Sequence, residues 1–495
     1  MGSTLRFFFE PKSIAVIGVS RREGSPGYVI FGNLLENRRR GVLRAKLYGV
    51  NIKGGEVLGE KLYRSILEIP DDVDHAIIVV PAKHVPEVIE ECGVKGVRVS
   101  TIVSSGFSEI GNFELEERLK RTAKRYGIRI VGPNGLGVYD PYSGVDTLFI
   151  PKTKRVDGEE ITNLARPGRG YIAFLTQSGA LGGVLLDYLA GEGLGVSKFV
   201  SWGNKVDVDE CDMMSYLLED PHTRVIAIYV ESIRGDGRRI VDVGMRVSRR
   251  KPIVVLKGGT TTAGARATLS HTASLAGDYR IYSAAFRKMG AVLADGMLDM
   301  LDKAKALALQ PPPRGDRVGI ITNGGGPGIL VADLAERRGL RVPELSKESL
   351  GEFKRYVEDG TIPEIATFSN PVDISGTATD EAYVAATETV IRDRNIDLVI
   401  ILALHHPPTI TMDMPKKILG IIRDYRKPAI VVDIGGLGLS NTVRRIFDNS
   451  SIPAYPLPER AVSGACGLVE YGMWLRRVGA YEEYVERWSP AKPTM

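Results

Sequence analysis

Short β-branched runs alternate with longer amphipathic stretches along the whole of this chain. That alternation predicts an α/β fold with parallel sheets, because a crossover helix must separate successive parallel strands. Helices are expected between the strands, for example at Val85–Cys92 and Phe113–Tyr126. The expected strands are Ser13–Gly18, Leu47–Asn51, His75–Val80, Val97–Val103, Ile128–Val131, Tyr171–Thr176, Gly195–Ser201, Val225–Val230, Pro252–Lys257, Ala291–Ala294, Val318–Thr322, Leu398–Ala403 and Ala429–Asp433.

The 495 residues divide into three blocks, in keeping with about 150 residues per domain. Residues 1–145 have the pattern of a doubly wound, Rossmann-like nucleotide-binding domain. Residues 146–309 and 310–495 each open with a strand, a Gly-rich loop and a helix (AFLTQSGALGGVLLDYLA and GIITNGGGPGILVADLAE), which predicts two related flavodoxin-like domains. The proline run Gln310–Pro313 is the clearest boundary, and the polar segment Pro151–Gly170 is predicted to be irregular.

Charge and cysteine content argue against several classes of protein. Lys+Arg 65 against Asp+Glu 60 gives a net charge of +5, which requires neither nucleic acid nor a membrane as a partner. No apolar run reaches the length of about 18 residues that a membrane span needs. The three cysteines lie far apart without a CxxC, which argues against a disulfide framework or structural zinc and fits a reducing cytoplasm.

Small polar residues follow the strands of the first block. Gly18, Ser20, Ser25 and Gly27 form a Gly-rich turn between a strand and a helix, whose amides can face an anion; a plain structural turn is the alternative. The turn is not GxGxxG and no clear acid ends the second strand, which speaks against NAD. Because the carboxyl ends of parallel strands line the ligand crevice, we expect these residues there too: Lys53, Val80, Pro81, Ser104, Ser105, Gly106 and Asn134.

The second block offers a second Gly-rich loop, with Gln177, Ser178 and Gly179 at the start of a helix. Ser178 is not a GxSxG nucleophile, because Thr176 holds the place of the first glycine. It could simply cap the helix; we favour an uncapped helix start without acidic residues, open to phosphate. The similar loop Thr322–Gly326 of the third block fits an anion site or a tight turn equally well.

One of the six histidines stands out as a candidate nucleophile. His271 lies in the Gly/Ala/Thr-rich segment Gly258–Gly277, which we expect to be a loop that can move. Glu231, at the end of an apolar strand, is the best partner to fix its tautomer, and a surface salt bridge is the alternative for this acid. No second His or Cys lies at zinc-ligand spacing. His405 and His406 end an apolar strand and could face a pocket, whereas His75, His84 and His222 are expected to be structural or solvated.

In this order, these residues resemble the α subunit of ADP-forming acyl-CoA (acetyl-CoA) synthetases, in the nucleoside-diphosphate-forming superfamily that includes succinyl-CoA synthetase. The motif SHTASLAG with the upstream Glu231 is the most specific part of the resemblance. The other motifs span nearly the whole chain: IAVIGVS, NIKGGEVLG, VVPA, SSGF, GPNGLG, TQSGALG, SWGNKVDVDE, TNGGGPGI and NPVDISGTAT.

The resemblance implies an acid–thiol ligase that interconverts acyl-CoA, ADP and phosphate with acid, CoA and ATP through an acyl phosphate and a phosphohistidine. His271 would be the phosphorylated residue, Glu231 would assist it, and Gln177, Ser178 and Gly179 would hold phosphate. CoA would lie on the strand ends of the first block, from Gly18 to Asn134. Gly135 and Ile52 depart from the family pattern, which usually has Cys and often Pro at these positions.

The nucleotide site is expected on another chain. The sequence has no Walker A motif and no stretch typical of an ATP-grasp fold. The resemblance therefore implies a separate ATP-grasp β subunit that binds ADP or ATP with Mg²⁺ in an α2β2 heterotetramer, and no metal on this chain. A succinyl-CoA-type enzyme and a non-catalytic CoA-binding regulator remain alternatives, and the acyl group stays open.

Overall fold

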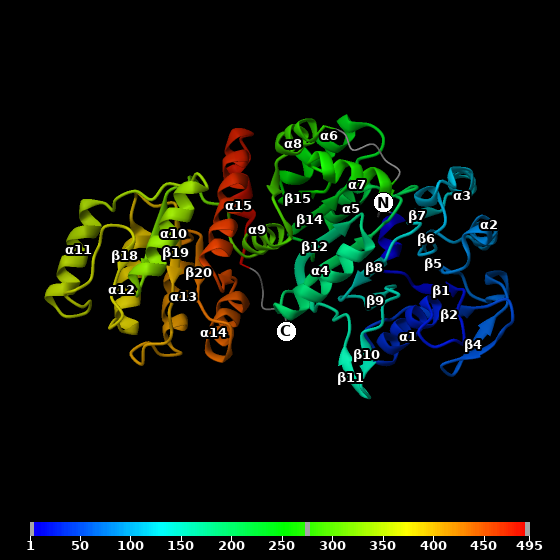
Figure 1. Ribbon diagram of the computed structural model, residues 1–495, viewed down its shortest axis with the longest axis horizontal. Helices are drawn as coiled ribbons and strands as arrows, with labels where there is room; N and C mark the ends of the chain where they lie inside the picture. Colours follow the sequence, from blue (N-terminus) through cyan, green and yellow to red (C-terminus); the bar gives the residue numbers. More distant parts are fainter. Residues whose placement is uncertain (1–3, 273–277, 491–495) are drawn as a thin grey trace. The chain divides into compact units, whose positions relative to one another are not determined.

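The computed structural model describes residues 4–272 and 278–490, with the backbone alone for residues 269–272. The chain separates into two compact units, Met1–Met289 and Gly290–Met495 (Figure 1). The division into three domains with boundaries at residues 145 and 309 stays a prediction.

A seven-stranded sheet opens the first unit, in the order β3-β4-β2-β1-β5-β6-β7. Its neighbours pair in parallel except for the hairpin of β3 and β4. All five residues of β1 are buried, as expected for a strand covered by helices on both faces. The strands are β1 (Ser13–Ile17), β2 (Lys46–Val50), β3 (Gly55–Val57), β4 (Glu60–Tyr63), β5 (His75–Ile78), β6 (Val99–Ile102) and β7 (Arg129–Val131).

Three helices cover this sheet, namely α1 (Pro26–Arg39), α2 (Val85–Lys95) and α3 (Phe113–Tyr126). Helices α2 and α3 share one face, because Ile89 and Leu119 pack in one apolar cluster with Ala15 of β1. Short 3₁₀ turns complete this part of the fold: η1 (Thr4–Phe8), η2 (Ile66–Glu68), η3 (Ala82–His84) and η4 (Ser108–Ile110).

A second sheet follows, whose strands within this unit have the order β15-β14-β12-β13-β8-β9. Strands β12 to β15 are parallel, and β8 joins β13 in the antiparallel sense. The strands are β8 (Gly137–Asp140), β9 (Val145–Asp146), β12 (Arg169–Thr176), β13 (Val196–Ser201), β14 (Val225–Val230) and β15 (Ile253–Lys257). The helices are α4 (Gly179–Gly191), α5 (Glu210–Glu219), α6 (Gly237–Ser248), α7 (Thr262–Thr272) and α8 (Tyr279–Lys288).

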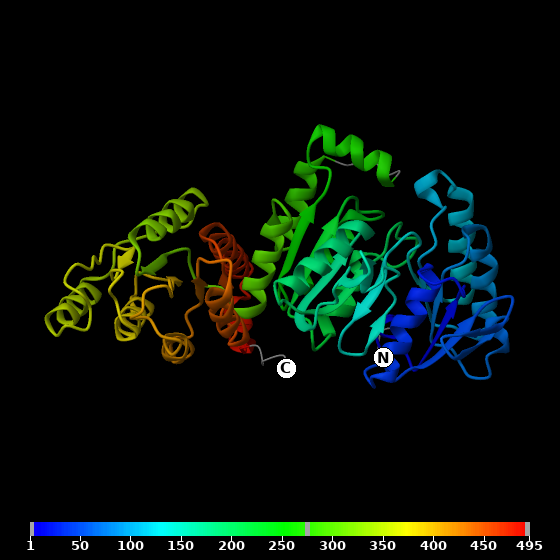
Figure 2. The same ribbon diagram turned by 60° about the horizontal axis from the view of Figure 1, so that its bottom comes forward.

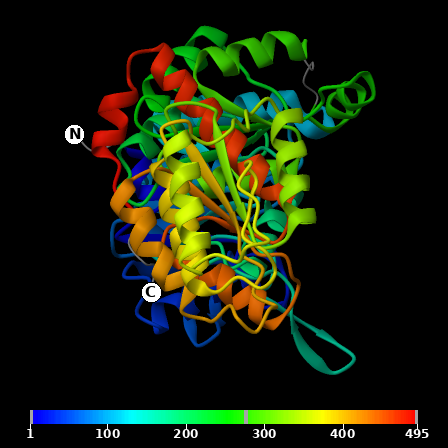
Figure 3. The same ribbon diagram turned by 90° about the vertical axis from the view of Figure 1, so that its left-hand side faces the viewer.

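The segment Pro151–Gly170 is not irregular throughout, so that prediction is wrong for Thr153–Thr162. It forms a hairpin of β10 (Thr153–Val156) and β11 (Glu159–Thr162), all of whose residues are exposed (Figure 3). Asp157 and Gly158 supply the two positive φ values that a tight hairpin turn requires. Because Val156 and Ile161 are the only large apolar residues of these two strands, the hydrophobic pattern gave little signal.

The second unit contains a parallel five-stranded sheet in the order β18-β17-β19-β20-β21, the flavodoxin-like arrangement. Helix α15 packs beside α9 (Figure 2). The five strands are β17 (Val318–Thr322), β18 (Val372–Asp373), β19 (Leu398–Leu402), β20 (Ala429–Val432) and β21 (Ala454–Tyr455), and β16 (Ala291–Ala294) is not part of this sheet. The helices are α9 (Met297–Leu309), α10 (Gly325–Arg337), α11 (Lys347–Glu358), α12 (Asp380–Arg392), α13 (Met414–Tyr425), α14 (Gly438–Asn449), α15 (Pro458–Arg477) and α16 (Tyr481–Arg487).

These sheets confirm the predicted fold class, a Rossmann-like domain followed by two flavodoxin-like α/β domains. Among the helices of the described residues, none is both long enough and apolar enough to cross a membrane.

Candidate active site

A cavity of about 690 Å³ lies in the first unit where the strand ends of its two sheets meet. Its volume is in the usual range for small-molecule sites. Eight residues predicted for the site line it: Val80, Pro81, Ser104, Ser105 and Asn134 from the first sheet, and Gln177, Ser178 and Gly179 from the start of α4. The structure therefore brings the predicted CoA side and the predicted phosphate side together.

Hydrogen bonds fix the strand ends on the CoA side. The Ser104 hydroxyl donates to the Val80 carbonyl at 2.5 Å, and the Asn134 amide donates to the Ser104 carbonyl at 3.0 Å. Asn134 has a φ of 60°, a left-handed conformation that few residues other than glycine adopt. Its side chain donates to the Asn204 side-chain oxygen at 3.3 Å, which links the two sheets.

The Gly-rich turn after β1 ends at the same sheet edge, but of its residues only Pro26 lines the cavity. A Cβ at Gly18 would lie 2.5 Å from the Val79 carbonyl oxygen, and a Cβ at Gly27 would lie 2.3 Å from that of Gly18. Both positions therefore require glycine. Ser20 and Ser25 bond within the turn and do not line the cavity.

Lys53 lies in the neighbouring loop, exposed and outside the cavity lining. Asn51 joins this loop to the turn, because its side chain donates to the Val19 carbonyl at 2.7 Å. Arg21 of the turn also joins the two segments, because its side chain donates to the Gly54 carbonyl at 3.3 Å. The CoA roles of Lys53 and of the turn stay predictions.

The Gly106 amide, another predicted contact, is held by Glu109 at 2.5 Å. Asn204 donates to the carboxylates of Glu109 at 2.7 Å and Glu116 at 2.9 Å, and Glu116 also pairs with Arg234 at 3.4 Å. Burial alone would raise the pKa of Glu109, but the hydrogen bonds from Gly106 and Asn204 lower it overall. Asn204 and Arg234 line the cavity and were not singled out from the sequence.

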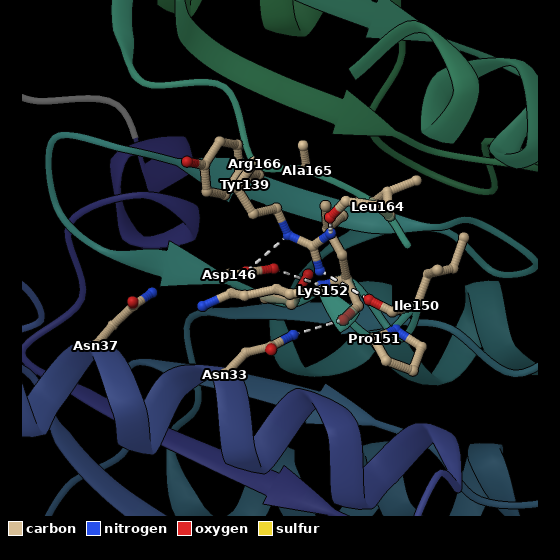
Figure 4. A network of polar contacts seen from close by, with 12 residues as sticks. Asn33, Asn37, Tyr139, Asp146, Ile150, Pro151, Lys152, Leu164, Ala165 and Arg166 are labelled. Atoms are coloured by element: carbon tan, nitrogen blue, oxygen red, sulfur yellow. Dashed lines mark hydrogen bonds and ion pairs between the residues drawn. The ribbon is translucent and has the colours of Figure 1, made fainter. Parts of the chain in front are cut away.

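Phe149 and Ile150 form an apolar wall of the cavity that the sequence analysis also missed. A buried ion pair supports this wall: Arg166 donates to Asp146 at 2.9 Å and to the Ile150 carbonyl at 2.9 Å (Figure 4). Asn33 of α1 holds the Leu148 carbonyl at 3.0 Å. The wall is therefore held by α1 on one side and by Arg166 on the other.

Helix α4 is capped, contrary to our expectation. The Ser178 hydroxyl accepts the Leu181 amide at 3.3 Å, which is the alternative that the sequence left open. The helix has no acidic residue in its first turn, and among the described residues no acceptor faces the amides of Gly179 and Ala180. The cap satisfies one amide and leaves two for an anion.

Glu231 lies directly beyond β14 at the carboxyl edge of the second sheet, as predicted, and is 5% exposed. The Tyr229 hydroxyl donates to its carboxylate at 3.2 Å. Burial and the nearby carboxylate raise the pKa of Tyr229 well above its ordinary value. The oxygen of Gln177 accepts the Glu231 amide at 2.9 Å, so the predicted phosphate residue and the predicted acid touch.

His271 belongs to the C-terminal end of α7, and its side chain lies outside what the structure describes. The expectation of an extended loop is wrong for Thr262–Thr272. The segment contains Ala263, Ala265 and Ala267, and alanine is the strongest helix former. Thr261 caps the helix by accepting the Gly264 amide at 3.1 Å. Residues 273–277, which complete the predicted loop, are outside the described residues.

His405 lies at the strand ends of the second unit, 3% exposed and 2.9 Å from the carboxylate of Asp433. Its Nδ1 also lies 2.7 Å from the Ala403 carbonyl oxygen, and its Nε2 has no partner among the described residues. His406 is exposed. Neither residue lines the cavity of the first unit.

Family comparisons match three parts of the chain. Residues 12–141 match the CoA binding domain, residues 169–307 the succinyl-CoA ligase like flavodoxin domain, and residues 318–476 the Ligase-CoA domain. The acetate–CoA ligase [ADP-forming] I subunit alpha of Pyrococcus furiosus is 40% identical over 95% of this chain and 98% of its own length. The chain belongs to this α-subunit family. The predicted family and the predicted class of acid–thiol ligase are confirmed, and the two alternatives are not better supported.

Some similar proteins named acetate–CoA ligase [ADP-forming] are longer than this chain. The enzyme of Methanocaldococcus jannaschii is 35% identical over 97% of this chain, which covers 65% of that protein.

The solved dinucleotide-forming acetyl-coenzyme A synthetase 1 of Ca. Korarchaeum cryptofilum, in complex with phosphate and ADP, is 35% identical with a TM-score of 0.84. The match covers 98% of this chain and 99% of that one.

Gly135, where the ligase family usually has cysteine, has a structural explanation here. A Cβ at this position would lie 2.2 Å from the Ser201 carbonyl oxygen. Gly135 also lines the cavity. A side chain would therefore require the backbone of this wall to shift.

Proposed function

We propose that this chain carries the CoA, acyl and phosphate half of the reaction acyl-CoA + ADP + phosphate ⇌ carboxylic acid + CoA + ATP. The observation that supports this most is the cavity, which is lined by strand ends of the CoA binding domain and by the start of α4. We place the CoA diphosphate at the Gly-rich turn after β1, which leads into the start of α1, a helix without acidic residues in its first turn.

The chemistry has two steps on this chain. Phosphate attacks the thioester carbonyl, the C–S bond breaks, and CoA leaves as the thiol, which gives an acyl phosphate. The imidazole of His271 then attacks phosphorus, the P–O bond to the acyl group breaks, and the acyl group leaves as a carboxylate. Glu231 stabilises the imidazole cation that forms and accepts its proton. The amides of Gly179 and Ala180 stabilise the phosphoryl oxygens.

The nucleotide half would lie on a separate ATP-grasp β subunit with Mg²⁺, in an α2β2 assembly. Two observations support the partner: similar proteins of Pyrococcus furiosus are named as α subunits, and some similar proteins named acetate–CoA ligase [ADP-forming] are longer than this chain. In the described part of the chain, no group of three or more His, Cys, Asp or Glu residues could hold a metal ion. The cytoplasmic location suggested by the cysteines stays a prediction.

The test uses the purified chain with acyl-CoA and labelled phosphate. We expect at most one labelled phosphohistidine per chain, located at His271, and release of CoA. ADP should yield ATP only after the β subunit is added. Sustained ATP synthesis by the chain alone would contradict the two-subunit reading, and CoA binding without any label would favour the regulator. A panel of carboxylic acids with the assembled enzyme then identifies the acyl group.

A further inference from the structure

Glu231 and Ser232 lie just past the end of β14 and are 5% and 2% exposed. Buried backbone N–H and C=O groups need hydrogen-bond partners. Here four such groups, the amides and carbonyls of the two residues, are all held by side chains. We call these four backbone groups the Glu231 segment.

One side chain holds both donors of the Glu231 segment. The side-chain oxygen of Gln177 accepts the Glu231 amide at 2.9 Å and the Ser232 amide at 3.1 Å. Gln177 directly precedes the Ser178 cap of α4. The helix start that we propose for phosphate and the proposed acid are therefore fixed to each other.

Two buried lysines hold the two acceptors. Lys257 at the end of β15 donates to the Glu231 carbonyl at 2.7 Å and also to the carbonyl of Gly258. Lys205 donates to the Ser232 carbonyl at 2.6 Å and lies 3.5 Å from the oxygen of Gln177. Lys257 thus ties the Glu231 segment to the start of the segment that leads to α7 and His271.

Both lysines are buried, and the burial of a charge is costly. Lys205 is buried with its ion-pair partner Glu210, their side chains being 1% and 3% exposed. Its backbone has a φ of 53°, a strained conformation of the kind that gathers at functional sites. Burial lowers the pKa of Lys257. Buried ion pairs contribute little to stability compared with apolar packing, so stability alone does not explain the pair of Lys205 and Glu210.

We propose that Lys205 and Lys257 are positioning residues, which fix the backbone of the Glu231 segment and thereby the place of the Glu231 carboxylate during phosphorylation of His271. The inference rests on the proposed function of Glu231. It does not require either lysine to touch the substrate.

The test replaces the buried pair together, with Lys205→Met/Glu210→Leu, so that no unpaired charge is left behind. We expect single-turnover phosphorylation of His271 to slow by about tenfold or more, since a misplacement near 1 Å can cost about 10²-fold. CoA affinity should stay at the wild-type value. Lys257→Met, measured in the same way, should slow phosphorylation as well.

Lys305 provides a matched control in the second unit. It is also buried, and it pairs with Asp448 at 2.8 Å and donates to the Ala454 carbonyl at 2.6 Å. Lys305→Met/Asp448→Leu should change the melting temperature about as much but leave the phosphorylation rate unchanged. An equal slowing in this control would assign the effect to general loss of stability and overturn the inference.

A double-mutant cycle with Glu231→Gln tests whether the lysine acts through the acid. If Lys205 acts through Glu231, adding Lys205→Met/Glu210→Leu to the Glu231→Gln variant should slow phosphorylation far less than it does in the wild type. The positioning role alone is overturned if Lys205→Met/Glu210→Leu slows phosphorylation by the same factor in the wild type and in Glu231→Gln. It is also overturned if Lys205→Met/Glu210→Leu phosphorylates at the wild-type rate while Glu231→Gln is slow. A wild-type rate for Glu231→Gln overturns the proposed role of Glu231 instead.

Discussion

The second and third domains begin with the same local structure, at Thr176–Gly182 and Thr322–Gly328. In each, the threonine hydroxyl accepts the amide two residues later, at 3.1 Å from Ser178 and 3.0 Å from Gly324. The next residue reaches across to the neighbouring strand end. Gln177 accepts two amides there, and Asn323 exchanges hydrogen bonds of 3.0 and 3.3 Å with Leu404.

The two loops differ in the chemical groups around this shared scaffold. The second domain places Glu231 and two buried lysines beside the loop, whereas the third places the buried pair of His405 and Asp433 at its strand ends. A repeated strand–loop–helix unit therefore fixes backbone geometry without fixing function. The predictions below set matched substitutions in the two domains against each other.

The largest effect is expected at the histidines. His271→Asn should abolish both phosphohistidine formation and ATP synthesis, because asparagine cannot accept the phosphoryl group. His405→Asn should retain full labelling, because its ring is buried beside Asp433, with Nδ1 2.7 Å from the Ala403 carbonyl oxygen, and does not line the cavity of the first unit. Acid-labile label counted per chain in both variants measures this. If folded His405→Asn protein also lost the label, His405 would be needed for phosphorylation as well, and the contrast between the two domains would fail.

A smaller effect is expected at the strand-end acids. Glu231→Gln should slow phosphorylation of His271 by about 10²-fold, the usual scale for losing a positioned proton acceptor. Asp433→Asn should lower the melting temperature instead, because Asp433 is fully buried beside His405. Rapid-quench kinetics and thermal melts on both variants separate the two outcomes. Unchanged kinetics for Glu231→Gln would reduce it to a structural carboxylate.

Most of the fold was predictable because buried parallel strands are continuous apolar runs. Val225–Val230 and Val318–Thr322 were predicted to the residue. Strands β18 and β21 have two residues each, too few to give a run, and the β10–β11 hairpin has only Val156 and Ile161 as large apolar residues. Helix α7 was missed because small residues were interpreted as a sign of mobility rather than of helix propensity.

The site was predictable where it follows strand ends and not where it depends on distant partners. Eight predicted residues line the cavity because parallel strands bring their carboxyl ends to one edge. Lys205, Lys257 and Arg166 were missed, because their partners lie far along the chain or in irregular backbone. One signal was present: Lys257 is a charged residue that ends an apolar strand, a position where an apolar residue would be ordinary.

A further contrast concerns charge at the two helix starts. Gly179→Asp puts a carboxylate into the first turn of α4, where a Cβ has room, since its nearest neighbour would lie 3.6 Å away. We expect the KM for phosphate to rise about tenfold through repulsion at a helix N-terminus. Gly326→Asp, in the open first turn of α10, should have a smaller effect. Equal effects would indicate that both helices hold phosphate.

The smallest effect is expected from the cap that distinguishes the two loops. Ser178 accepts the Leu181 amide, whereas Gly324 at the same position of α10 makes no side-chain bond. Ser178→Ala should cost about 1 kcal/mol of stability, and Ser178→Gly only a few tenths. Gly324→Ser should bring no comparable gain, because Pro327 holds the place of Leu181 and has no amide hydrogen to donate, and the added Cβ would lie 2.9 Å from the end of the Leu404 side chain. Thermal melts of the three variants give the order. If Ser178→Ala melts like the wild type, the 3.3 Å bond adds nothing, and the two loops are equivalent in stability as well as in backbone.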